Sequence, residues 1–78
     1  MIKEYESKIK ECRDKLGPIP FDILLILERC IKLEQVIVIS ILFDFIDATI
    51  KVKNYNLLRA YLLNDSFQKA LVRMEKNA

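Results

Sequence analysis

The chain has 78 residues, carries a formal net charge of +2 and contains one glycine, two prolines, two cysteines and no histidine. This length allows one domain, and a nearly neutral charge argues against a protein that binds nucleic acid mainly by electrostatics. An apolar fraction of 53% excludes a disordered chain, and the scarcity of glycine and proline excludes an all-β fold with many turns. The composition therefore predicts one all-α domain spanning residues 1–78.

The features that usually stabilise very small domains are mostly missing from this sequence. Cys12 and Cys30 allow at most one disulfide, and the charged N-terminus lacks the apolar segment of a secretory signal. We therefore expect two reduced thiols in a cytoplasmic protein. Two separate thiols without histidine do not supply the four ligands of a zinc site, so neither a metal nor a cofactor is expected. Oligomerisation or a partner protein is the remaining source of extra stability.

Residues 2–16 have the pattern of an amphipathic helix. Apolar residues repeat at steps of three and four, and glutamates precede lysines by four positions on the polar face. Gly17 and Pro18 are expected to end this helix, because glycine accepts a left-handed conformation and proline cannot continue a helix. Residues 17–20 are then a stiff turn. The apolar stripe consists of Ile2, Tyr5, Ile9, Cys12 and Leu16.

Residues 21–53 are the most apolar part of the chain. Their β-branched residues favour a strand, but polar residues from Ser40 to Asn54 recur at steps of four and three, which is the helical period. The polar stripe of residues 28–35 is rotated from this one by roughly 100° at 3.6 residues per turn. We therefore predict helix, and favour a break near Glu34, within residues 33–36, over one continuous helix. The longest uncharged run has nine residues, against the ~20 that span a bilayer, so no membrane span is expected.

Residues 55–76 form the last predicted helix, with Asn54 and Asn56 as candidate N-caps. Residues 64–66 have the composition of a turn, and Asp65 begins a capping-box pattern. Because the apolar stripe passes this cluster without a change of phase, one continuous helix is preferred. The predicted fold is a small bundle of three long helices, or of four if the middle segment breaks.

The apolar surplus of the middle segment is the main indication of function. The narrow stripes of the flanking helices cover only part of it, and exposed apolar patches mark interfaces. We expect self-association, with a symmetric dimer favoured, or docking on a larger protein; a monomer is the alternative if the middle segment folds back near Glu34. The protein is interpreted as an adaptor or a stoichiometric regulator. Its richness in isoleucine and lysine also fits a phage, plasmid or viral origin.

The predicted interface combines the middle segment with the last helix. Interface energy is dominated by large aromatic side chains in apolar surroundings, so the aromatic members are expected to contribute most. The predicted interface residues are Ile37, Ile41, Phe43, Phe45, Ile46, Leu57, Tyr61 and Phe67.

Two other functions remain as alternatives. A small helical enzyme would use Asp44 and Asp47, which lie three positions apart on one helix face, although a solvated polar stripe is the preferred explanation of these two residues. No nucleophile–base pair and no phosphate-binding loop is visible, so no catalytic residue is assigned. A nucleic-acid-binding regulator would use the basic C-terminal third, in which tyrosines interleave. Its candidate residues are Lys51, Lys53, Arg59, Lys69 and Arg73.

Overall fold

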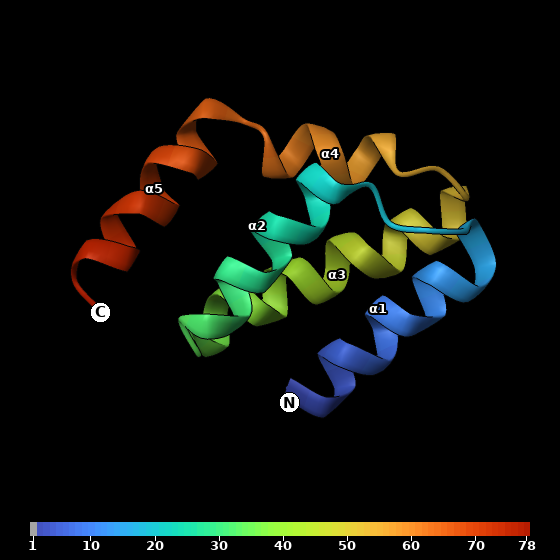
Figure 1. The fold of residues 1–78 in the computed structure, drawn as a ribbon, viewed down its shortest axis with the longest axis horizontal. Coiled ribbons are helices and arrows are strands. Elements are labelled where there is room, and N and C mark those ends of the chain that lie inside the picture. Colours follow the sequence, from blue (N-terminus) through green and yellow to red (C-terminus); the bar gives the residue numbers. More distant parts are fainter. Residues whose placement is uncertain (1) are drawn as a thin grey trace.

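The computed structural model describes residues 2–78, and all regular structure within that range is helical (Figure 1). This confirms the all-α class. The bundle is built from five helices instead of the predicted three or four, because both the middle segment and the last predicted helix are divided. They are α1 (Ile2–Leu16), α2 (Phe21–Lys32), α3 (Val36–Val52), α4 (Asn56–Leu62) and α5 (Asp65–Lys76).

The middle apolar segment folds back on itself between α2 and α3. Glu34 takes a left-handed conformation with φ 53°, and its backbone N–H donates to the carbonyl of Ile31 at 3.1 Å. The break falls where the two polar stripes of the sequence change phase. As a hairpin, the segment turns much of its apolar surface toward the rest of the chain, which one long helix would not do.

The last segment is not the continuous helix that its uninterrupted apolar stripe suggests. Asn64 breaks it and caps α5, since the Asn64 side-chain oxygen accepts a hydrogen bond from the backbone N–H of Phe67 at 3.2 Å. Gln68 does not complete a capping box; its side chain donates instead to the carbonyl of Leu62 at 2.6 Å, at the end of α4. The bend allows Leu62 and Leu71 to be fully buried on either side of it.

The first helix lies along α3 (Figure 1). Its predicted apolar stripe faces the core, with Tyr5 and Cys12 buried. Lys8 does not pair with the glutamate four positions earlier, but donates to Asp47 on α3 at 2.9 Å. Gly17 has φ 88°, which is the left-handed conformation expected where α1 ends. The hydroxyl of Tyr55, which precedes α4, donates to the carbonyl of Gly17 at 2.7 Å and holds this turn against the bundle.

The core is one cluster to which all five helices contribute. The radius of gyration, 11.9 Å, is close to the ~11.5 Å expected for a chain of this length. The accessible surface, 5149 Å², is close to the ~4,900 Å² that a 9.2-kDa monomer exposes. The chain therefore closes its own core, and the apolar surplus is reduced to a limited set of exposed side chains. The large side chains with less than 2% exposure are Tyr5, Ile23, Leu27, Leu42, Ile46, Leu58, Leu62 and Leu71.

Within residues 2–78, no helix is at once long enough and apolar enough to cross a membrane.

Candidate protein-interaction surface

The orientation of α3 determines where apolar surface remains exposed. Ile39, Leu42 and Ile46 recur at steps of three and four, share one side of the helix and are 2%, 0% and 1% exposed. The opposite side of α3 has two edges, which run along the helix axis and differ in polarity. Its edge toward α1 carries polar residues together with Phe43, and Asp47 there binds Lys8; its edge toward α4, where Phe45 stacks on Tyr61, is apolar.

The apolar edge consists of four residues at steps of four, seven and four. Ile37 is 76% exposed, Val52 is 57% exposed and Ile41 is 40% exposed, while Ala48 is half-buried. We call Ile37, Ile41, Ala48 and Val52 the α3 row. A single exposed isoleucine on a protein surface is ordinary, but several apolar residues aligned on one side of a helix form an apolar strip.

Beside the α3 row, aromatic side chains join three helices. The rings of Phe45 and Tyr61 stack with centroids 3.9 Å apart, and Phe67 on α5 follows Tyr61 at 4.9 Å in a tilted arrangement. Such pairs contribute about 0.5–1.5 kcal/mol each beyond the area they bury, so they hold α4 and α5 in place. Leu57, one turn before Tyr61 on α4, is 38% exposed and adds an apolar side chain on the neighbouring helix.

Six of the eight predicted interface residues lie in or beside this strip: Ile37 and Ile41 in the row, Leu57 beside it, and the three half-buried aromatic residues Phe45, Tyr61 and Phe67. The remaining two lie elsewhere.

Ile46 belongs to the core, because it shares the buried face of α3 and is 1% exposed. It is not available to a partner. Phe43 lies on the edge of α3 toward α1, where the Lys8 ammonium is 5.6 Å from the centre of its ring. Ala48 and Val52 were not predicted, although the helical phase of Ile41 places both on its side. Periodicity was the signal that could have found them.

The basic residues considered for nucleic-acid binding do not gather into one groove. They come from α3, its C-cap, α4 and α5, and three of the five are paired with carboxylates. Such pairing lowers the positive potential that a phosphate backbone requires. Lys53 instead ends α3 in a left-handed conformation, and Arg73 lies on the outer face of α5. The ion pairs are Lys51–Asp47 (3.4 Å), Arg59–Asp22 (3.2 Å) and Lys69–Asp65 (3.0 Å).

Asp44 and Asp47 are not arranged as an acid–base pair. Hydrogen bonds from Lys8 and Lys51 lower the pKa of Asp47, whereas a general acid at neutral pH needs a raised pKa. Asp44 is exposed and lines an open hollow of 220 Å³ between α1 and α3. Within residues 2–78, no three His, Cys, Asp or Glu side chains are grouped so that they could hold a metal ion.

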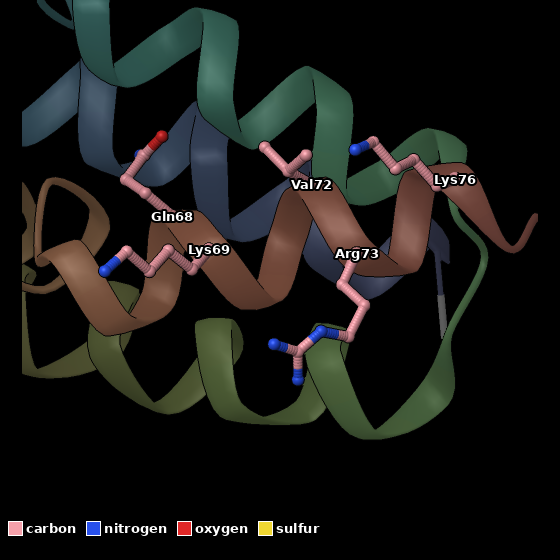
Figure 2. Close-up of a pocket in the computed structure, with 5 residues that line it drawn as sticks. All are labelled: Gln68, Lys69, Val72, Arg73 and Lys76. Carbon is pink, nitrogen blue, oxygen red and sulfur yellow. The ribbon is translucent and has the colours of Figure 1, made fainter.

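A second hollow, of 430 Å³, is lined by residues of α5 alone (Figure 2). Figure 2 shows these side chains spread along the outside of the helix, with Arg73 pointing away from Gln68 and Val72. Ligand pockets enclose most of their ligand and converge a few polar groups on it. This hollow does neither, so it is exposed helix surface.

Comparisons with protein-family models, curated proteins and solved structures gave no match. The chain forms a small helical domain with a closed core and an apolar strip along α3, while other exposed apolar side chains such as Phe21 and Leu25 lie on α2.

Proposed function

We propose that this protein is a protein–protein interaction module, an adaptor or a stoichiometric regulator, which binds through the α3 row and the adjoining Leu57. The observation that carries the proposal is the exposure of Ile37, 76%, at one end of the α3 row. A domain that buries three other isoleucines of α3 has no internal use for this one. Apolar strips of this kind on small domains mark interaction sites.

The energy available from the strip sets what kind of complex it supports. The exposed fractions of Ile37, Ile41, Val52 and Leu57 amount to about two whole aliphatic side chains. Burying these contributes ~3–6 kcal/mol at ~1.5–3 kcal/mol per side chain. Association costs about 4–15 kcal/mol in lost freedom of motion. The strip therefore favours reversible association, and its partner has to contribute apolar surface of its own.

Ile37→Lys tests the proposal without disturbing the core, because the isoleucine is mostly exposed. Val72→Lys is the matched control, since Val72 is 41% exposed on α5, away from the strip. Phe45 is less suitable, because its ring stacks on Tyr61 within the chain and its loss threatens the fold.

The measurements are the mass in solution by light scattering over a range of concentrations, and the proteins of the native host that the immobilised domain retains. We expect Ile37→Lys to lose self-association or retention while Val72→Lys keeps both. The two variants should match the original protein in helical circular dichroism and melting temperature. Identical behaviour of all three proteins in both measurements would show that the strip is not an interaction surface.

A further inference from the structure

We infer that the α3 row binds a second copy of this chain, with the two α3 helices packed antiparallel across a two-fold axis. This inference rests on the proposed function, because it names the occupant of the same face. The observation behind it is the spacing of the row. Its steps of four, seven and four read the same in both directions along the helix.

A two-fold axis through the midpoint of the row makes it complementary to itself. Ile37 then lies opposite Val52 of the second copy, and these are the two most exposed members of the row, at 76% and 57%. Ile41 lies opposite Ala48 of the second copy, so a large side chain meets a small one, as close packing of helices requires. A parallel pair would set Ile41 against Ile41 and Ala48 against Ala48, which crowds one position and leaves a gap at the other.

The shape around the row also favours a helix as its partner. The row belongs to a single helix, with the stacked rings of Phe45 and Tyr61 on one side of it and the polar residues of α3 on the other. A groove would accept an extended or helical peptide from many proteins. A row of side chains along one helix is matched by a similar row on a second helix, and the antiparallel copy supplies one with matching apolar residues.

The polar edge adds a further consequence. Asp44 lies next to the midpoint of the row, so the antiparallel arrangement brings the Asp44 carboxylates of the two copies toward each other beside the axis. Like charges repel, and salt screens this repulsion. We therefore expect Asp44→Asn to tighten the dimer several-fold at low salt, with a smaller gain at high salt. In a parallel pair the two carboxylates lie on opposite sides of the interface, and Asp44→Asn has little effect.

Cysteine cross-linking tests the register directly. Full-length chains with Ile41→Cys and with Ala48→Cys, one of them enlarged by a tag, are oxidised with glutathione disulfide separately and as a mixture. The natural Cys12 and Cys30 are 1% and 0% exposed, so they do not compete. Val72→Cys, on α5, measures random cross-linking.

The antiparallel register predicts which pairs react. In a mixture, the thiol introduced by Ile41→Cys in one chain meets the thiol introduced by Ala48→Cys in the other. In each variant alone, the two introduced thiols are offset by seven residues, ~10 Å along the helix. A disulfide needs β-carbons ~3.5–4.5 Å apart. We expect the mixed disulfide to form at least tenfold faster than either homodimeric disulfide and than the Val72→Cys background.

Failure of this inference is distinguishable from failure of the proposed function. Faster cross-linking of each variant alone than of the mixture, or background rates throughout, overturns the antiparallel dimer. The proposed function survives that result if Ile37→Lys still abolishes association with another protein. It fails as well if Ile37→Lys changes neither mass nor retention.

Discussion

The hydroxyl of Tyr5 is buried without a hydrogen-bond partner, and no other side-chain nitrogen or oxygen within residues 2–78 is in that position. The side chain is 0% exposed, and burial raises the pKa of its phenol well above the usual range. A buried polar group without a partner costs about 1–3 kcal/mol of stability. The substitution Tyr5→Phe removes this hydroxyl and keeps the ring that packs in the core.

We expect Tyr5→Phe to raise the free energy of unfolding by about 1 kcal/mol. The lower end of the range applies because the small void left by the oxygen forfeits some van der Waals contact. For a domain of this size, the gain corresponds to an increase of roughly 4–8 °C in melting temperature. Tyr55→Phe is the matched control with the opposite sign. The Tyr55 hydroxyl donates to the carbonyl of Gly17 at 2.7 Å, so its removal should lower stability by about 0.5–1.5 kcal/mol.

Urea unfolding followed by far-ultraviolet circular dichroism measures both changes. The slope of the free energy against urea should stay unchanged, since neither substitution alters the surface exposed on unfolding. If Tyr5→Phe destabilises the domain as much as Tyr55→Phe does, the Tyr5 hydroxyl has a partner, such as an ordered water, and the reasoning is refuted.

Three further predictions concern stability. Glu34→Gly should raise the free energy of unfolding by about 0.5–1 kcal/mol in urea titrations. The reason is that Glu34 has φ 53°, a conformation that glycine adopts without steric cost. A loss of stability would mean that the Glu34 side chain has a role of its own. Leu71→Ala should lower the free energy of unfolding by ~2–5 kcal/mol, since Leu71 is the buried residue of α5. Its control is Ala70→Ser, at an exposed position of the same helix, which should cost under ~0.5 kcal/mol. Equal effects of the two would show that α5 does not pack as described.

The third concerns alkaline pH: burial raises the pKa of the Cys30 thiol to about 11, so the neutral thiol is favoured in the folded state. The contribution of this thiol to the free energy of unfolding is therefore complete below its pKa in the unfolded chain. It is lost as the pH rises from about 9 through 11. The melting temperature should be constant from about pH 7 to 8.5 and should fall above about pH 9. The fall should be smaller in Cys30→Ala. An equal fall in both proteins would contradict the assignment of this effect to Cys30.

Much of the local structure could be predicted because it depends on neighbouring residues. The limits of α1 follow from its apolar stripe and from Gly17, whose conformation is the one expected. The hairpin near Glu34 follows from two polar stripes that cannot face solvent together on one straight helix. The bend at Asn64 could not be decided from the sequence, because the same residues allow a continuous stripe or a cap, and the burial of Leu62 and Leu71 decides between them.

The sequence by itself determined that this chain is helical, where its first helix ends and which residues share each side of a helix, because these properties follow from backbone chemistry and the 3.6-residue period. Only the tertiary structure decided which apolar side is covered. Ile46 and Ile37 are the same residue type on the same helix, yet one is 1% exposed and the other 76%. The period sets their relative phase along α3. The positions of α1, α2 and α4 around that helix set which phase faces the core and which is left for a partner.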